Sequence, residues 1–225
     1  MVAGATEPPL VIDYACGAGH FLNEVARTMR HYAEKHQSPI PIKDFYSHIV
    51  GIEKEYRLSK VAKVSAFMYS QDDIRIVYGD ALAQQDDVKD GTFQLLVANP
   101  PYSVKGFLET LTEEERTRFE LFSDKLDLNK NNSIETFFIE RAKQLLAPGG
   151  VCAIILPCSV LNKGNIYIAC RAIILKNLDL VAVAEFGSGT FGKTGTNTIT
   201  LFMRRKNNPV DVSEHYNNRV AAGFK

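Results

Sequence analysis

The segment with the clearest chemical potential is Asn99-Pro100-Pro101-Tyr102, which directly follows an apolar run. Two consecutive prolines restrict the backbone and remove two N–H donors, so the segment mainly offers hydrogen-bond acceptors. The Asn99 side-chain oxygen and the Pro100 carbonyl can accept both hydrogens of a planar amine, which localises its lone pair on nitrogen. Tyr102 presents a face on which a base can stack. The residues predict a site where such an amine attacks a sulfonium methyl group; an Asn-Pro turn beside a core tyrosine is the plain structural alternative.

A glycine turn, Gly17-Ala18-Gly19, follows the apolar run 10–15 and precedes apolar residues at helical spacing. Glycine permits both a tight turn and the close approach of a ligand to the backbone. Two glycines also occur in ordinary turns between a strand and a helix. This motif alone therefore identifies no ligand.

Acidic residues end three successive predicted strands: Asp13, Glu53 and Asp80. Glu53 suits the hydroxyls of a ribose, or else it is solvated in the charged run EKE. It lies further from the glycine turn than the usual interval of about 20 residues, which implies an insertion around 33–45. Asp80 can accept from an exocyclic amine, or it can cap a turn after Gly79. The chain has no GxxxxGK[ST] motif, which argues against a polyphosphate and favours a nucleoside with a cationic centre.

Strands and helices alternate along the chain and would bring these residues to one edge of a sheet. The predicted strands cover 10–15, 48–55, 74–82, 93–102, 151–157, 180–187 and 197–205, and helices follow the glycine turn and cover 56–69 and 134–147. Apolar runs between helices are typical of strands buried on both faces. The pattern predicts an α/β fold with a doubly wound, mostly parallel sheet of seven strands and with ligands at the carboxyl ends of its strands.

Three segments interrupt this pattern. Residues 36–45 contain two prolines and cannot continue the first helix. Residues 103–132 are charged, show little apolar periodicity and exceed the usual length of a connection, so we expect a functional or disordered loop. Residues 207–225 offer no apolar stripe for a core, and we expect an extended or frayed tail after one catalytic domain over 1–206.

Composition indicates the cellular compartment of the protein but not its binding partners. The 225 residues contain 26 basic and 26 acidic side chains, so net charge does not indicate whether nucleic acid binds. The four cysteines lack the spacing of zinc sites, so we expect reduced thiols and no metal site. No apolar stretch reaches the roughly 18 residues that span a membrane, and the N-terminus is unlike a signal peptide, which favours a cytoplasmic protein.

The order of these motifs resembles that of the N6-adenine DNA methyltransferases, particularly the modification subunits of type I restriction systems and related restriction enzymes. DYACGAGHFL is similar to the first motif of that family, GIEKE to the second, GDAL to the third, NPPY to the fourth and GSGTFGKTGTNTITLFMRR to the eighth. The resemblance extends from about Val11 to Arg204. It implies a Rossmann-like class I methyltransferase fold with an antiparallel last strand, and S-adenosylmethionine as the cofactor.

Carried over onto this sequence, the resemblance implies two sets of site residues. The residues that would surround the cofactor are Asp13, Ala15, Gly17, Gly19, Phe21, Glu53, Asp80 and Ala81. The residues that would hold the target adenine are Asn99, Pro100, Pro101 and Tyr102, with Phe191 on its other face. Because the amine of a paired adenine is hidden in the duplex, the base would have to flip out. The implied partners are DNA and a specificity or restriction subunit, or fused domains.

The chain departs from the family because the cofactor motif upstream of the first strand is missing, and no target-recognition domain is recognisable after Arg204. We therefore expect a catalytic core and do not expect sequence-specific activity from it alone. Two alternatives remain open. The same geometry around NPPY serves a glutamine amide in a protein or a guanine amine in ribosomal RNA, and the missing motif also fits a non-catalytic scaffold that binds the cofactor. A Rossmann oxidoreductase is disfavoured because the third glycine of GxGxxG is absent.

Overall fold

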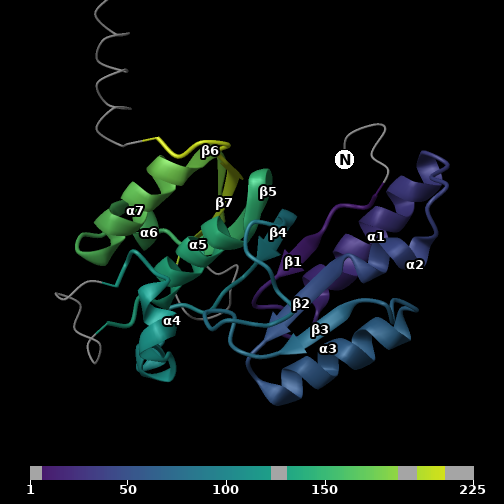
Figure 1. Ribbon diagram of the computed structural model, residues 1–225, viewed down its shortest axis with the longest axis horizontal. Coiled ribbons are helices and arrows are strands. Elements are labelled where there is room, and N and C mark those ends of the chain that lie inside the picture. The colour runs from purple at the N-terminus through teal and green to yellow at the C-terminus, as the bar shows by residue number, and fades with distance from the viewer. Residues whose placement is uncertain (1–6, 123–130, 187–196, 211–225) are drawn as a thin grey trace, which may run out of the picture.

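The computed structural model describes residues 7–122, 131–186 and 197–210, which form a sheet flanked by helices (Figure 1). The described strands form one seven-stranded sheet in the order β3-β2-β1-β4-β5-β7-β6. They are β1 (Val11–Asp13), β2 (Ile49–Glu53), β3 (Arg75–Tyr78), β4 (Phe93–Ala98), β5 (Leu146–Pro157), β6 (Leu178–Glu185) and β7 (Thr198–Arg205). Neighbouring strands are parallel except β7, which is antiparallel to both β5 and β6. The predicted α/β class and antiparallel last strand are confirmed.

The helices gather in two groups around this sheet. They are α1 (His20–Lys35), α2 (Ile42–Ser47), α3 (Tyr56–Met68), the 3₁₀ helix η1 (Phe107–Thr110), α4 (Glu113–Thr117), α5 (Ile134–Leu145), α6 (Ser159–Asn162) and α7 (Ile166–Asn177). Figure 1 shows α1, α2 and α3 near β1, β2 and β3, and α4 to α7 toward the other end of the sheet. Accordingly, α3 packs on β2 and β3, whereas α5 packs on β5 and α7.

Strand β1 separates two apolar cores. Val11 belongs to the core that includes Leu22 of α1 and Ala62 of α3, whereas the next residue, Ile12, belongs to the larger core that includes α5. Successive strand residues point to opposite faces of a sheet, and Val11 and Ile12 are both fully buried. Strand β1 is therefore covered on both sides, as its continuous apolar run predicts.

Helix α1 begins directly after the glycine turn and ends before the two prolines. Its buried face repeats every three or four residues and consists of Leu22, Ala26, Met29 and Ala33. The predicted break is confirmed, but the short helix α2 after Pro41 was not predicted. Proline suits a helix start because its fixed φ is already helical and its missing N–H would have no partner there.

The segment 103–122 contradicts our expectation of a loop without apolar pattern. Its buried apolar side chains are Phe107, Leu108, Leu111, Phe119 and Leu121. The rings of Phe107, Phe119 and Phe122 lie 5.3, 5.6 and 5.4 Å, between centroids, from that of Phe137 on α5. A 3₁₀ turn followed by a helix of five residues has no single period, which explains why the sequence pattern missed it. Residues 123–130 of the same predicted loop lie outside the described residues.

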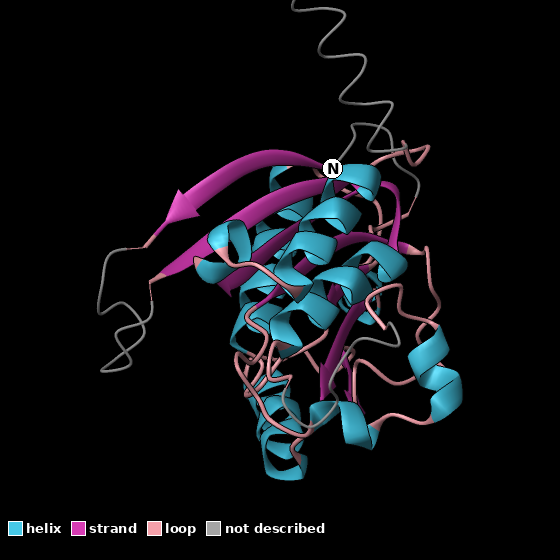
Figure 2. Ribbon diagram, turned by 90° about the vertical axis from the view of Figure 1, so that its left-hand side faces the viewer, coloured by secondary structure: helices cyan, strands magenta, loops and turns pink. Residues whose placement is uncertain are grey.

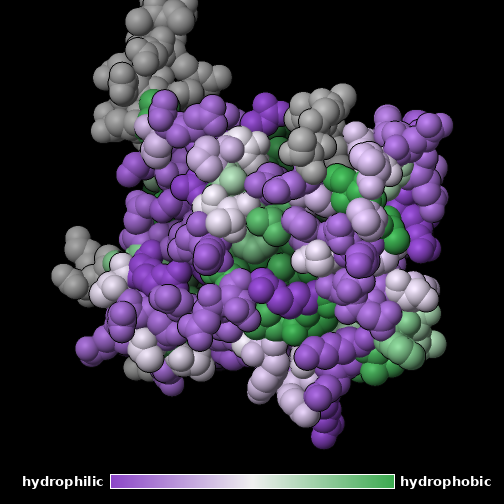
Figure 3. Space-filling view, turned by 45° about the vertical axis from the view of Figure 1, so that its right-hand side comes forward, coloured by the Kyte–Doolittle hydropathy of each residue, from purple (hydrophilic) through white to green (hydrophobic). Residues whose placement is uncertain are grey.

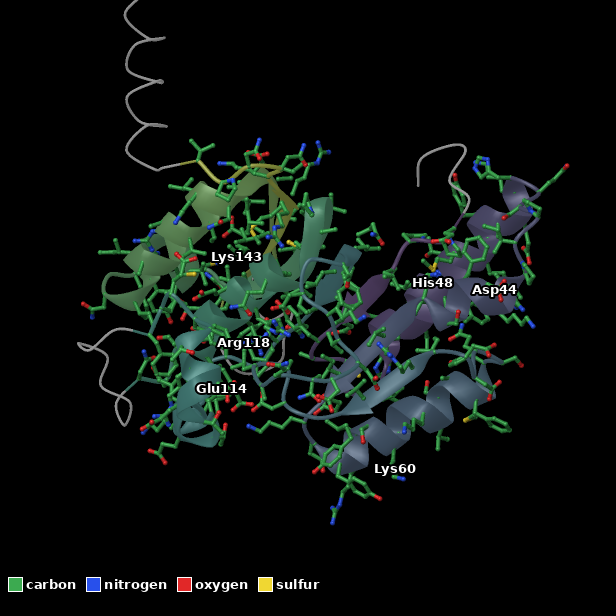
Figure 4. The ribbon with its side chains drawn as sticks, in the orientation of Figure 1. Asp44, His48, Lys60, Glu114, Arg118 and Lys143 are labelled. Carbon is green, nitrogen blue, oxygen red and sulfur yellow. The ribbon has the colours of Figure 1, made fainter. Side chains whose placement is uncertain are left out.

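Polar contacts attach the same segment to α5 and to the loop before β4. The Lys143 ammonium of α5 lies 2.6 Å from the Glu120 carboxylate, and the Arg118 guanidinium lies 3.0 Å from Asp90. Figure 4 labels Arg118, at the end of α4, and Lys143, on α5, in this region. Glu140 of α5 accepts hydrogen bonds from two backbone N–H groups of the segment, at residues 120 and 121. The segment is therefore part of the folded domain.

Other boundaries also differ from those predicted. Strand β5 begins at Leu146 rather than 151, and α6 and α7 occupy 159–177, for which we predicted no element. Strand β6 is an edge strand that is exposed after Leu178, and Figure 2 shows β6 and β7 extending beyond the helices. Of the predicted tail, residues 211–225 lie outside the described residues.

Large apolar side chains are exposed on several elements, among them Val64, Phe67 and Met68 on α3 and Leu180 and Val181 on β6. Figure 3 shows apolar atoms at the surface in the centre and at the lower right of the view. The four cysteines are free thiols. In the described part of the chain, no helix is both long and apolar enough to cross a membrane.

Candidate active site

The glycine turn and the end of β2 are joined directly. The Gly17 N–H donates to a Glu53 carboxylate oxygen at 2.9 Å, and the other Glu53 oxygen accepts from the Glu55 N–H at 2.7 Å. Gly17 and Gly19 have φ of 53° and 86°, values that favour glycine. A side chain at Gly17 would meet nothing within 4 Å, whereas one at Gly19 would press on Ala62 of α3 at 3.3 Å. The turn therefore leaves open space at Gly17 and needs glycine at Gly19 for packing.

Asp13 is the buried acid of this cluster, with 1% of its surface exposed. One carboxylate oxygen accepts from the Ala15 N–H at 3.0 Å. Burial raises the pKa of Asp13 to about 7, and the nearby charge of Glu53 acts in the same direction, while the bond from Ala15 opposes them. Because strands β1 and β2 are adjacent, the structure brings Asp13, Ala15, Gly17 and Glu53 together as predicted. Such a cluster attracts a cation or a donor of hydrogen bonds.

Asp80 follows β3 and is half-buried at the same edge of the sheet. One of its carboxylate oxygens accepts from the Leu82 N–H at 3.0 Å, and the other lies 2.6 Å from the Lys54 ammonium. The first contact is the turn cap that we considered as the alternative for this residue. Lys54 was not predicted as part of the site, although it directly follows Glu53 in the sequence. A ligand amine at Asp80 would share the carboxylate with Lys54.

Ala81 is buried next to Asp80, and its carbonyl accepts from the Arg141 guanidinium at 3.0 Å. Arg141 lies on α5 and is fully buried. The same guanidinium donates to Asp90 at 2.6 Å. Arg141 thus joins α5 to both ends of the loop between β3 and β4. The sequence does not reveal these contacts, because a charged residue in an amphipathic helix normally faces solvent.

The loop Asn99–Tyr102 follows β4, which pairs with β1 in parallel. Asn99 is exposed, and its side-chain oxygen accepts from the Tyr102 hydroxyl at 2.5 Å. The same hydroxyl is 3.1 Å from the Ile155 carbonyl of β5. Partial burial, together with the charge of Glu135, raises the pKa of Tyr102, so its hydroxyl keeps its proton and remains a donor. Pro100 is buried and Pro101 is exposed.

Phe21 lies on the first turn of α1, directly after the glycine turn. It lines a cavity of about 600 Å³ over one face of the sheet, with Val97, Ile155 and Phe186 among the other lining residues. Ile155 links this cavity to the loop Asn99–Tyr102, because it lines the cavity and its carbonyl contacts the Tyr102 hydroxyl. Phe191, the predicted second stacking residue, lies outside the described residues. Among the described residues, no group of three or more His, Cys, Asp or Glu side chains has the arrangement of a metal site.

A curated relative with similar sequence is the type II restriction enzyme and methyltransferase RM.BcgI of Heyndrickxia coagulans. The two are 26% identical over 203 residues, which cover 89% of this chain and 28% of the relative. The chain therefore spans less than a third of the length of that protein.

Solved structures share the fold. The M protein of the type I restriction enzyme EcoKI has a TM-score of 0.68 at 17% identity, over 89% of this chain and 41% of that one. A protein described as a class I S-adenosylmethionine-dependent methyltransferase, from Listeria monocytogenes, has a TM-score of 0.70 at 18% identity, over 94% and 57%. The methyltransferase subunit of a type I restriction-modification system from Streptococcus thermophilus has a TM-score of 0.66 at 19% identity, over 98% and 49%.

The fold is thus the Rossmann-like class I methyltransferase fold that the sequence motifs imply. A family model described as N-6 DNA Methylase matches residues 2–219, which is nearly the whole chain. This chain belongs to the N-6 DNA methylase family.

Proposed function

We propose that this chain is the catalytic core of an adenine-specific DNA methyltransferase, which transfers a methyl group from S-adenosylmethionine to the N6 amine of a flipped adenine. The observation that carries the proposal is the position of Asn99. Its amide is exposed at the carboxyl end of β4, beside the strand that ends in Asp13 and leads into the glycine turn. Family membership supports DNA as the substrate.

The residues at the ends of β1 and β2 fit the proposed cofactor. Asp13 and Glu53 place two acids beside open space at Gly17, which suits a ligand that carries positive charge and ribose hydroxyls. Each Glu53 oxygen accepts one backbone N–H and retains a lone pair for a hydroxyl. Asp80 and the backbone at Ala81 are the proposed contacts for its adenine ring. When bound, the cofactor supplies an electrophilic methyl group.

Asn99 and Pro100 would activate the target amine. The nitrogen lone pair of adenine is delocalised into the ring, and two acceptors on the amine hydrogens draw it back onto nitrogen. The Asn99 oxygen and the Pro100 carbonyl are the proposed acceptors. After transfer the nitrogen carries one proton in excess, which passes to solvent.

Tyr102 would hold the flipped base by stacking, an interaction worth about 1–3 kcal/mol per base. Its hydroxyl contacts Asn99 and Ile155, so the ring is oriented before the substrate binds. A rigid stacking face offsets part of the energy needed to unstack the base from the duplex.

Recognition of a DNA sequence is proposed to come from a partner. The chain covers 41% of the EcoKI M protein and 28% of RM.BcgI, a restriction enzyme and methyltransferase. We infer that this chain works with a specificity or restriction subunit, or with fused domains, in a restriction-modification system in the cytoplasm, where its DNA substrate lies.

The test is transfer of a tritiated methyl group from S-adenosylmethionine to three substrates in parallel: unmethylated genomic DNA, ribosomal RNA and a glutamine-containing peptide. We expect label in DNA only, recovered as N6-methyladenine after digestion. Label in RNA or peptide, or none in any substrate in the presence of the partner subunits, contradicts the proposal. The cofactor site is tested separately by calorimetry, where Glu53→Ala should weaken binding of S-adenosylmethionine; unchanged affinity argues against its ribose contact.

A further inference from the structure

Glu135 is a buried carboxylate next to the catalytic loop that the proposed transfer does not use. It lies in the first turn of α5 and is 0% exposed. One oxygen accepts from the Ser103 N–H at 3.1 Å, and the other accepts from the Tyr167 hydroxyl of α7 at 2.6 Å. Buried carboxylates are rare unless both oxygens have donors. Glu135 therefore connects the loop after β4 to two helices of the larger core.

Ser103 is the point where this connection reaches the catalytic loop. It directly follows Tyr102 and has φ of 53°, a left-handed conformation that is unfavourable for serine. Such a conformation persists only where the surroundings hold it. The bond from its N–H to the buried Glu135 carboxylate is a contact that can hold it.

The direction of the chain at Ser103 determines where Tyr102 lies. The hydroxyl of Tyr102 contacts Asn99 and Ile155. The backbone of Tyr102 continues directly into Ser103, whose N–H donates to Glu135. Small displacements of a positioned group reduce reaction rates strongly, because the acceptors must meet the amine in the correct geometry. Loss of the Glu135 contact would therefore affect transfer more than it affects cofactor binding.

We propose that Glu135 is a positioning residue for methyl transfer, which acts through Ser103 to hold Tyr102 and Asn99 in the orientation that receives the target amine. This inference rests on the proposed function of the same loop. Tyr167 orients Glu135 from the other side, as the third member of this chain of contacts.

Glu140 provides a matched control on the same helix. It is equally buried, at 0% exposure, and it also accepts from backbone N–H groups, those of Glu120 and Leu121 at 2.6 and 3.1 Å. Its partners lie in the segment that packs on α5 and do not adjoin Tyr102. Replacing either glutamate by alanine removes a buried carboxylate and leaves backbone donors unpaired, so both variants lose stability.

The experiment compares Glu135→Ala, Glu135→Gln and Glu140→Ala in the full chain with its partner subunits. We measure kcat and KM for DNA, the Kd of S-adenosylmethionine, the melting temperature, and hydrogen exchange of the peptide that contains Ser103. Glu135→Ala should lower kcat by about tenfold to a hundredfold, the loss expected when a bond to a charged group is removed. Its cofactor Kd should stay within about twofold of the wild type. Exchange at Ser103 should become faster.

Glu140→Ala should lower the melting temperature but leave kcat and exchange at Ser103 unchanged. Glu135→Gln should restore most of kcat, because its amide oxygen can still accept from Ser103 while its amide N–H₂ donates to the Tyr167 oxygen. Equal loss of kcat in the two alanine variants, wild-type kcat in Glu135→Ala, or absence of rescue by glutamine would overturn the inference.

Two further readouts keep the inference testable. If Glu135→Ala does not fold, Tyr167→Phe removes only the hydroxyl that orients Glu135; it should speed exchange at Ser103 and lower kcat, and wild-type values of both overturn the inference. If the wild type transfers no methyl group to any substrate, the proposed function fails, while hydrogen exchange at Ser103 still shows whether Glu135 holds the loop.

Discussion

The Tyr102 hydroxyl donates a hydrogen bond to the Asn99 side-chain oxygen at 2.5 Å, so the acceptor proposed for the target amine already has a donor. The amine must share or replace this bond when the base enters. The hydroxyl can then keep its second acceptor, the Ile155 carbonyl at 3.1 Å. The contact restrains Asn99 in the free protein, and in the proposed mechanism it would compete with the amine.

Tyr102→Phe should therefore separate the two roles of this side chain. The ring remains for stacking, while the competing hydroxyl is lost; since a hydrogen bond contributes about 0.5–1.5 kcal/mol net, we expect KM for DNA to fall by roughly twofold to tenfold. Tyr102→Ala removes the ring as well and should lower kcat/KM by roughly fivefold to a hundredfold. Steady-state kinetics on the same DNA compare them. Equal losses in both variants would show that the hydroxyl, not the ring, matters for substrate.

Asn99→Ala should remove the side chain proposed as the main acceptor for the target amine. Loss of one such group typically lowers kcat by about 10²–10³. Because Asn99 makes no contact with Asp13 or Glu53 among the described hydrogen bonds, the affinity for S-adenosylmethionine should stay within about twofold. Single-turnover transfer and calorimetry measure the two quantities. Normal turnover in this variant is incompatible with the proposed mechanism.

The affinity for S-adenosylmethionine should depend on pH through Asp13. Its pKa of about 7 means that the carboxyl is half protonated near neutral pH, and a cationic ligand favours the ionised form. Affinity should therefore be constant above pH 7 and fall by up to about tenfold for each pH unit below it. Calorimetry across this range measures the slope. The matched variant Asp13→Asn should bind more weakly with a flat profile; a slope that survives in Asp13→Asn assigns it to another group.

The same pKa predicts how stability changes without ligand. The folded protein holds the Asp13 proton more tightly than the unfolded chain, whose value is 3.8, so the free energy of unfolding falls as pH rises between 3.8 and about 7. Asp13→Asn should remove this contribution and raise the melting temperature of the free protein at pH 8. Its amide oxygen can still accept from the Ala15 N–H, so the turn is kept. A lower melting temperature at pH 8 would contradict the prediction.

Gly19→Ala should destabilise the domain more than Gly91→Ala. Both glycines have positive φ, which costs an alanine about 1–2 kcal/mol, but only at Gly19 would the new methyl group press on another element, Ala62 of α3 at 3.3 Å. At Gly91 it meets nothing within 4 Å. Chemical denaturation should give a difference of about 1 kcal/mol between the variants. Equal losses would mean that α3 yields to the added methyl group.

The elements that form the candidate site could be predicted from the sequence because each is local. The apolar run through Val11 and Ile12, the glycines at Gly17 and Gly19, and the two prolines after Asn99 each specify a strand, a turn or a rigid loop over a few residues. Alternation of such strands with helices specifies a parallel sheet, and in that sheet the carboxyl ends of strands meet. The acids Asp13 and Glu53 meet there for that reason.

Contacts between residues distant in the sequence were decided only by the tertiary structure. The Lys54 contact with Asp80, the Arg141 contact with Ala81 and the Glu135 contact with Ser103 join residues 26, 60 and 32 positions apart. Periodicity predicts which face of a helix is buried, but it cannot show that a charged side chain on that face has a partner there. The packing of 103–122 on Phe137 could not be predicted from local sequence either. The burial of this segment depends on α5, a helix that comes later in the chain.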